Sequence, residues 1–463
     1  MPSLTRKMAD FTLGLHYEDI PAPAIKEAKR FLLDSVGCAL AAVRNEDMAA
    51  MYRFTEKLGG AAESTLIGTG ARTNAHNAAL MNSLLVRALD YNDIYWEQDP
   101  SHPSDILFGA ISPAEALGRD GRETLVAMVI AYELEMRWCL ACFPGVREVG
   151  WHHATLTQFV SPFVAGRIYG LDADQLVAAA GIAGSSHFTL GGVVAGHLTN
   201  MKNTADPLAT QAGVLAAMMA REGYEGPVEV IEGKEGFQHV IHNVDLKPEI
   251  LLDGLGERFL ITDCGYKAFP TEALTHQPMS AVQSIMSENG LAAEDVAKIH
   301  IRTTTRGADI LSDPSKYDPQ TKETADHSLP YCLAAVAANG SVYPNSFEPE
   351  KLFDPRIRRL LGLIEVVADA EIDAMFPGTK RAIATIDTTD GRRFTTTVDH
   401  AKGSPQNPMS DEELIAKFTA NAEGVTSAAR REEIVAATWG FDGLADVGDY
   451  VRLLVADRDR PAN

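Results

Sequence analysis

The sequence predicts a mainly α-helical protein with a large all-helical domain and a smaller α+β domain. Apolar residues recur at three- and four-residue spacing from about residue 20 to 245, which is typical of amphipathic helices. Strand-like alternation begins near residue 296, and helical spacing returns after about residue 410. A chain of 463 residues is also longer than one hydrophobic core usually serves, so two structural units are expected.

The helical half is predicted from five stretches whose alanine and glycine residues permit close helix packing. They are AIKEAKRFLLDSVGCALAAV, NAHNAALMNSLLVRAL, GRETLVAMVIAYELEMRWCLA, DADQLVAAAGIAGSS and ADPLATQAGVLAAMMAREG. The run NAALMNSLLVRALDYND is expected to continue as a helix to a break near Asp93. We therefore expect a helical domain over residues 1–268.

The smaller domain is expected over residues 269–403. VAKIHIRTT alternates as a strand does, and RAIATIDTTDGRRFTTTVDHAKG alternates around an Asp-Gly pair, which predicts a hairpin. The tail returns to helix in SDEELIAKFTANAEG, where Ser410 and Glu413 have the spacing of a capping box. The C-terminal helices of residues 404–463 are expected to pack back on the helical domain, or on the smaller one.

Composition excludes several classes of function. The formal net charge of -22 would repel nucleic acid and anionic membranes. No apolar run is long enough to span a bilayer and the first residues lack a secretory signal, so a cytoplasmic protein is expected. An anionic small substrate would need a local cationic pocket in this acidic chain.

Cysteine and histidine spacing argues against a metal or redox centre. The chain has only five cysteines, too few and odd in number for a disulfide framework. Cys139 and Cys142 form a lone CxxC inside an apolar helical stretch, where core packing is the expected role. Neither HxxxH nor HExxH occurs, so we expect no metal and no cofactor.

One candidate cluster lies in ALDYNDIYWEQDPSHPSDILFGA, where Asp90, Asp93 and Asp105 crowd His102 at a predicted helix end. Close carboxylates would raise the pKa of His102 and suit it for proton transfer. Two other interpretations stay open. Asp105 could be a helix N-cap with His102 a surface loop residue, or the group could bind a metal.

Four further stretches carry groups suited to acid-base chemistry or anion binding. His152 and His153 precede a helix in GWHHATLTQF, although paired histidines there could simply be buried and neutral. Lys202 falls just before an alanine-rich helix, where a cation gains nothing from the helix dipole. The last two stretches, CGYKAFPTEALTHQP at the domain junction and KETADHSLPYCLAAVAANG, contribute Lys267, Glu272, His276, His327 and Tyr331.

Taken together, these motifs resemble the MmgE/PrpD family in order and approximate spacing along nearly the whole chain. The resemblance implies a helical domain joined to an α+β lid, a homodimer, and metal-free lyase chemistry on di- and tricarboxylates in the interdomain cleft. The catalytic residues that it implies are His102, His153, Lys202, Lys267, Tyr331 and Asp93. The substrate-binding residues that accompany them are Asp90, Trp96, His152, Glu272, His276 and His327.

Two segments favour a dehydratase within this family. FPTEALTH, with Glu272, and WEQDPSHPSD, with Trp96, look like dehydratase-like members, so dehydration of 2-methylcitrate or citrate is the expected reaction. MKNTADP departs from the usual lysine segment by placing Asp206 and Pro207 early in the helix. A decarboxylase or epimerase of the same fold, or a non-catalytic carboxylate-binding dimer, are the alternatives.

Overall fold

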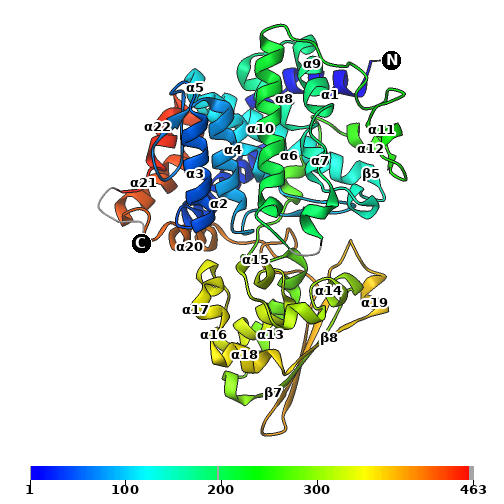
Figure 1. Cartoon of the computed structure of the whole chain (residues 1–463), viewed down its shortest axis with the longest axis vertical. Coiled ribbons are helices and arrows are strands. Elements are labelled where there is room, and N and C mark those ends of the chain that lie inside the picture. The colour runs from blue at the N-terminus through cyan, green and yellow to red at the C-terminus, as the bar shows by residue number, and fades with distance from the viewer. Residues whose placement is uncertain (1, 196–197, 458–463) are drawn as a thin grey trace.

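A computed structural model describes residues 2–195 and 198–457 of the chain, and the fold is mainly α-helical, as predicted. Helices α1 to α12 occupy the upper part of the molecule (Figure 1). They are Leu4–Gly14, Ala22–Ala42, Glu46–Leu58, Ala75–Arg87, Leu107–Leu117, Gly121–Ala141, Ala154–Thr157, Ser161–Tyr169, Ala173–Gly184, Met201–Arg221, Phe237–Val240 and Pro248–Leu252.

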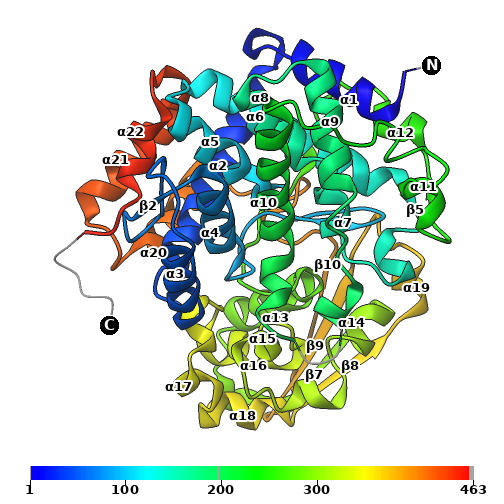
Figure 2. The same ribbon diagram turned by 45° about the horizontal axis from the view of Figure 1, so that its top comes forward.

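Close packing of small residues organises this helical part. Helix α6 is buried along almost its whole length and is capped by Asp120, whose side chain accepts the N–H of Glu123. Helices α8 and α10 approach so closely that a side chain on Gly213 would collide with Ser161. Figure 2 shows α10 running lengthwise between α4 and α9, and α4, α8 and α9 all contact it. Alanine and glycine therefore set the helix spacing here.

A four-stranded mixed sheet lies in the lower part of the molecule in Figure 1, in the order β10-β9-β7-β8. Strand β7 pairs in parallel with β8 and antiparallel with β9. The strands β7 to β10 are Val296–Thr303, Ile364–Ala368, Ala382–Thr388 and Arg393–Val398. The predicted hairpin is confirmed, because β9 and β10 pair directly around Asp390 and Gly391, whose φ is +86°.

Seven helices accompany this sheet. Helix α13 packs against β9 and β10, and α16 packs against α13, α18 and β8. Helices α13 to α19 are His276–Glu288, Thr305–Asp309, Lys322–Ala325, Leu329–Asn339, Pro349–Leu352, Pro355–Leu361 and Ala370–Asp373.

The C-terminal helices α20, α21 and α22 are Asp411–Ala422, Ala428–Trp439 and Val447–Leu453. The predicted capping box of Ser410 and Glu413 is present at the start of α20. Leu414 and Tyr450 belong to the same hydrophobic core as α2 and α6, whereas a second core gathers around the sheet. These two cores support the predicted division of the chain, which stays a prediction; residues 458–463 lie outside the described residues.

Three short antiparallel pairs complete the chain, and one of them shapes the candidate site. The strands β1 to β6 are Ser64–Thr65, Arg72–Thr73, Tyr95–Trp96, Pro100–Ser101, Cys142–Phe143 and Asp245–Leu246, paired consecutively. Pairing of β3 with β4 folds the chain back just before His102. All five cysteines are buried and unbridged, as expected for core packing.

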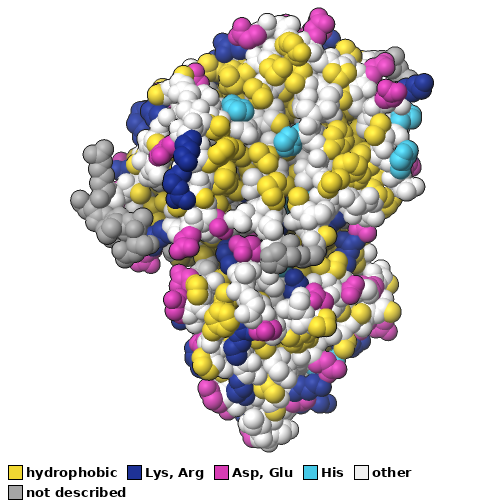
Figure 3. Space-filling model, viewed as in Figure 1, with side chains coloured by type: hydrophobic (Ala, Val, Ile, Leu, Met, Phe, Trp, Pro, Cys, Tyr) yellow, Lys and Arg dark blue, Asp and Glu magenta, His cyan; other side chains and the backbone are white. Residues whose placement is uncertain are grey.

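The surface carries charges of both signs. Figure 3 shows Lys and Arg side chains beside Asp and Glu side chains where the helical and α+β parts meet. No helix in the part of the chain that the structure describes has the length and apolarity that crossing a membrane requires.

Candidate active site

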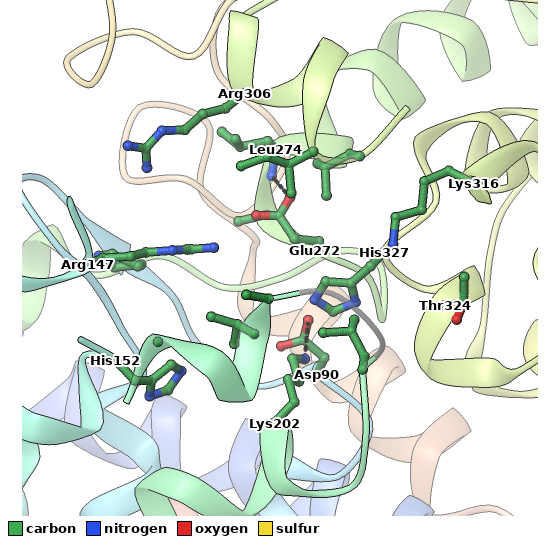
Figure 4. A pocket seen from close by; sticks show the side chains of 18 of the residues that line it. Asp90, Arg147, His152, Lys202, Glu272, Leu274, Arg306, Lys316, Thr324 and His327 are labelled. Atoms are coloured by element: carbon green, nitrogen blue, oxygen red, sulfur yellow. Dashed lines mark hydrogen bonds and ion pairs between the residues drawn. The ribbon is translucent and has the colours of Figure 1, made fainter. Parts of the chain in front are cut away.

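A cavity of about 1110 Å³ lies between the helical part and the α+β part. Figure 4 shows side chains from both parts pointing into it, with Glu272 and His327 facing Asp90 and Lys202. Most of the predicted site residues line this cavity, namely Asp90, Trp96, His102, His152, His153, Lys202, Lys267, Glu272 and His327.

Asp90 is the point where two distant lysines meet. Its Oδ2 lies 3.1 Å from Lys202 Nζ on α10, its Oδ1 lies 2.8 Å from Lys267 Nζ, and Arg87 also pairs with it. Burial alone would raise the pKa of Asp90, but Lys202, Lys267 and Arg87 hold it well below its usual value. Asp90 therefore stays ionised and keeps both lysines at the cavity wall.

The chain turns sharply to place this carboxylate. Helix α4 ends at Arg87, and Asp90 adopts a left-handed conformation with φ of +51°. The predicted helix to Asp93 is thus wrong by a turn or more, because the ion pairs and this turn override the helical pattern of the sequence. Lys202 also differs from the prediction: it lies inside α10, as the second residue of that helix.

Lys202 is buried, with 4% of its surface exposed. Burial lowers its pKa to about 8, although Asp90 opposes the shift. Besides the ion pair, Nζ has no hydrogen-bond partner of normal geometry in the described part of the chain. Its N–H groups are available to an anion in the cavity.

His102 is held in one tautomer. Its Nδ1 lies 2.6 Å from the backbone oxygen of Asp93, so Nδ1 carries the proton and Nε2 carries the lone pair. Burial, with Arg87 and Lys267, lowers the pKa of His102 well below its usual value. The predicted rise is therefore wrong, because burial is the largest effect and Arg87 and Lys267 add to it, while Asp90 opposes the shift without reversing it.

Asp93 and Asp105 hold the loop around His102 through buried contacts on the side away from the cavity. The Asp93 carboxylate accepts hydrogen bonds from Ser104 Oγ at 2.7 Å and Tyr132 Oη at 2.7 Å, and burial raises its pKa to about 6. Asp105 Oδ2 lies 3.3 Å from Arg87 Nε. Neither side chain lines the cavity. The N-cap interpretation of Asp105 is also wrong, because α5 begins two residues later without a side-chain cap.

Both histidines of the pair line the cavity, but their partners differ. His153 Nε2 lies 3.1 Å from Asp206 Oδ2. His152 Nδ1 accepts the backbone N–H of Ala154 at 3.2 Å, and burial with the adjacent His153 holds the pKa of His152 well below its usual value. The His153 ring centroid lies 3.9 Å from that of His152 and 5.7 Å from that of His102.

The α+β part contributes an acid and a second paired histidine. The Glu272 carboxylate accepts the N–H of Leu274 at 2.7 Å, and burial raises its pKa against the opposing effect of Arg147. His327 Nδ1 lies 2.5 Å from Asp326 Oδ1, and burial, with Lys202, lowers the pKa of His327 to about 4. Figure 4 shows His327 directed toward Asp90.

Trp96 connects the two parts at the edge of the cavity. It packs into the core around the sheet, with its ring centroid 5.8 Å from that of Phe376 in an edge-on arrangement. The Arg147 guanidinium lies 5.8 Å from the Trp96 ring, within cation–π range.

Tyr331 and His276 do not line this cavity. Tyr331 is fully buried in the core around the sheet, and its hydroxyl donates to the backbone oxygen of Ser346 at 2.7 Å. His276 lies against Phe269 and borders a separate hollow of about 130 Å³. The structure contradicts both predicted placements, because the helices carrying these residues turn the side chains toward the core and a neighbouring hollow.

Four basic residues that line the cavity were not predicted from the sequence. Arg87, Arg147, Arg306 and Lys316 line the cavity, and none of them stood out by spacing. Asp206, noted only as a departure in the lysine segment, proves to be the partner of His153. Asp206 is the one acidic residue of α10, and this was the signal that could have identified it, since a carboxylate is rarely buried without a partner.

Metal independence stays a prediction. His152, His153 and Asp206 each offer one ligand atom, and these atoms lie within 4.8 Å of one another. The contacts described above engage one atom of each residue, whereas His153 Nδ1 has no partner among the described residues.

The fold and cavity define a two-part, mainly α-helical protein with a cavity between its parts that basic and acidic side chains both line. The chain belongs to the MmgE/PrpD family, as its motifs predicted. The model of the MmgE/PrpD N-terminal domain matches residues 6–249, and that of the MmgE/PrpD C-terminal domain matches residues 269–440.

Relatives of this chain carry two different activities in their names. It is 27% identical to the 2-methylcitrate dehydratase of Salmonella typhi, over 85% of this chain and 84% of the relative. It is 23% identical to the cis-aconitate decarboxylase of Aspergillus terreus, over 97% and 96% of the two chains. The cis-aconitate decarboxylase of Homo sapiens is 24% identical, over 98% and 95%.

Proposed function

We propose that the protein is a lyase that removes water from a di- or tricarboxylate, with 2-methylcitrate or citrate as the favoured substrate. The observation that carries this proposal is the pair of histidines, His102 and His153, whose ring centroids lie 5.7 Å apart at the cavity wall. Dehydration of a β-hydroxy acid needs a base for the proton α to a carboxylate and an acid for the departing hydroxide. Two imidazoles side by side can supply both.

Cationic side chains would bind and polarise the substrate. Lys202 and Lys267 would hold the carboxylate next to the carbon that loses its proton, where negative charge develops during the reaction. Arg147 and Arg306 line the cavity away from Lys202, as Figure 4 shows, and suit a second carboxylate. This arrangement supplies the local positive charge that an anionic substrate needs in a chain of net charge -22.

Decarboxylation is the nearest alternative, since relatives of both kinds match this chain at similar identity. It needs one proton donor for the new C–H bond rather than an acid and a base together. Two histidines with different hydrogen-bond partners therefore favour dehydration. Epimerisation and non-catalytic carboxylate binding complete the set of alternatives.

The proposal also includes metal-free chemistry and a homodimer. The lysines and arginines can stabilise the charge that a metal would otherwise neutralise. The homodimer follows from the family resemblance alone.

The decisive experiment supplies purified protein with 2-methylcitrate, citrate and cis-aconitate in separate reactions. An increase in ultraviolet absorbance from an unsaturated acid with 2-methylcitrate or citrate supports the dehydratase. Carbon dioxide release would instead identify a decarboxylase, and loss of optical rotation without a new double bond an epimerase. Calorimetric binding without any turnover would overturn the enzymatic proposal.

A further inference from the structure

Asp206 is a buried carboxylate at the back of the candidate site. It lies in α10 with 1% of its surface exposed, its Oδ2 is 3.1 Å from His153 Nε2, and its Oδ1 is 3.2 Å from Thr157 Oγ1. Burial would raise the pKa of Asp206, but the His153 ring and its hydrogen bond, with His152 and Arg87, hold it well below its usual value. The carboxylate is therefore ionised.

His153 is held at one nitrogen only. Its Nε2 faces Asp206, whereas its Nδ1 is buried and has no hydrogen-bond partner in residues 2–195 and 198–457. A buried polar nitrogen without a partner is costly unless something else occupies the site. Because His153 lines the cavity, a group of the bound substrate is the natural partner for Nδ1.

We propose that Asp206 is a positioning residue that keeps His153 protonated, so that His153 is the acid and the neutral His102 is the base. The inference rests on the proposed lyase function and assigns the two roles within it. A carboxylate at hydrogen-bond distance orients an imidazole and stabilises its positive charge. Environments that push two neighbouring groups toward opposite protonation states are a mark of an acid and base pair.

The other charged groups around His153 do not replace Asp206 in this role. Asp99 accepts the backbone N–H groups of Val146 at 2.7 Å and Arg147 at 3.1 Å. Burial raises the pKa of Glu135 to about 8, so Glu135 is largely uncharged near neutral pH. The remaining ionisable groups that interact with His153 or its partner Asp206 are Arg87, His102, His152 and Asp105. Arg87 and the two histidines carry no negative charge. Asp105 faces Arg87, and burial raises the pKa of Asp105 well above its usual value, so it does not replace Asp206.

The proton balance of the reaction then closes. His102 Nε2 forms a new N–H bond as the C–H bond α to the substrate carboxylate breaks. The freed electron pair becomes the carbon–carbon double bond while the C–O bond breaks. The leaving oxygen takes the proton from His153 Nδ1 and departs as water, after which His102 returns one proton to His153.

The test compares Asp206→Asn, which keeps the shape but removes the charge, with Asp206→Glu, which keeps the charge. Glu115→Gln is the matched control. Glu115 is also a buried carboxylate, it accepts a hydrogen bond from Thr65, and it does not line the cavity. With 2-methylcitrate as substrate, Asp206→Asn should lower kcat about 100-fold or more and change KM less than about threefold. The alkaline limb of kcat, which reports groups of the enzyme–substrate complex, should also move to lower pH by about one unit. Asp206→Glu should restore part of kcat, and Glu115→Gln should leave the pH profile in place.

A second measurement separates this inference from the proposed function. Long-range ¹H–¹⁵N spectra of histidine-labelled protein report the protonation of each ring, and the His153 signals are identified by their loss in His153→Gln. The inference is supported if both ring nitrogens of His153 carry a proton at pH 7 in the wild type and only one does in Asp206→Asn. This result would support the His153–Asp206 pair even if no polycarboxylate is turned over. A neutral His153 whose spectrum is the same in both proteins overturns it. So does a stoichiometric metal that Asp206→Asn releases, because a metal would take the place of the ring proton.

Discussion

The substitution His102→Asn tests the two nitrogens of His102 separately. The asparagine amide can donate to the backbone oxygen of Asp93, as Nδ1 does at 2.6 Å, but it places nothing where Nε2 was. His102→Ala removes both functions. The two variants therefore distinguish loss of proton transfer from loss of a structural hydrogen bond.

The expected magnitudes differ for turnover and for stability. General base catalysis is worth about 10² to 10⁴ in rate, or about 3 to 5 kcal/mol in the barrier, and both variants should lose it. Only His102→Ala leaves the buried backbone oxygen of Asp93 without a donor, which costs about 1 to 3 kcal/mol of unfolding free energy. His102→Asn should unfold at a denaturant concentration close to that of the wild type.

Turnover is measured from the absorbance of the unsaturated product, and stability from urea unfolding. His276→Asn is a suitable control, since His276 is also a buried histidine but lies outside the cavity. Its turnover should stay within about threefold of the wild type. If His102→Asn also keeps turnover within tenfold while folding normally, Nε2 takes no proton and the role assigned to His102 is refuted.

The remaining predictions concern charge. Lys202→Met and Lys267→Met should each raise KM about tenfold or more, because each loses one ion pair with a substrate carboxylate; an unchanged KM would exclude them as binding groups. Since the pKa of Lys202 is lowered to about 8, its positive charge is lost as the pH rises through 8, so kcat/KM should fall there and Lys202→Arg should move that fall to higher pH. Lys417→Met should lower the unfolding free energy by about 3 to 5 kcal/mol in urea titrations, because it leaves Asp34 buried without its ion pair. The double variant Lys417→Met/Asp34→Asn should recover part of that loss. Activity should survive dialysis against a chelator, and a parallel loss of activity and bound metal would contradict metal-free chemistry.

The sequence predicted the helices and the hairpin well, because both depend on local patterns. Apolar spacing over 121–141 matches α6 residue for residue, and the Asp-Gly pair at 390–391 marks the turn between β9 and β10. A turn residue or a hydrophobic stripe can be recognised from a few neighbouring positions, because the physical cause of the turn or helix is local.

The loop that carries Asp90 and His102 could not be predicted to the same detail. Its sequence contains three carboxylates near one histidine, and spacing alone suggested that they surround the ring. In the fold, Asp90 faces two lysines that are over one hundred residues away in the chain, and Asp105 faces Arg87. Which charges meet is decided by tertiary packing, so the predicted direction of the His102 pKa shift was wrong.

Tyr331 is a second residue whose side-chain position could not be predicted from a local pattern. A position four residues after His327 can share its face of a helix, but His327 precedes α16 rather than belonging to it. The chain direction changes at Ser328, whose side chain caps the helix by accepting the N–H of Tyr331 at 3.0 Å. Helical spacing therefore says nothing about the relative direction of the two side chains.

The C-terminal helix α20 contributes to the candidate site without lining its cavity. Lys417 Nζ donates to the backbone oxygens of Tyr91 at 2.8 Å and Lys267 at 2.9 Å, and it lies 2.7 Å from Asp34 Oδ1 on α2. One buried ammonium thus fixes the two backbone segments that carry Asp90 and Lys267, which are 177 positions apart. An ion pair buried between such distant segments needs its backbone held in place, because a small displacement would leave both charges desolvated and unpaired. The return of the chain to the helical part after the sheet supplies that constraint.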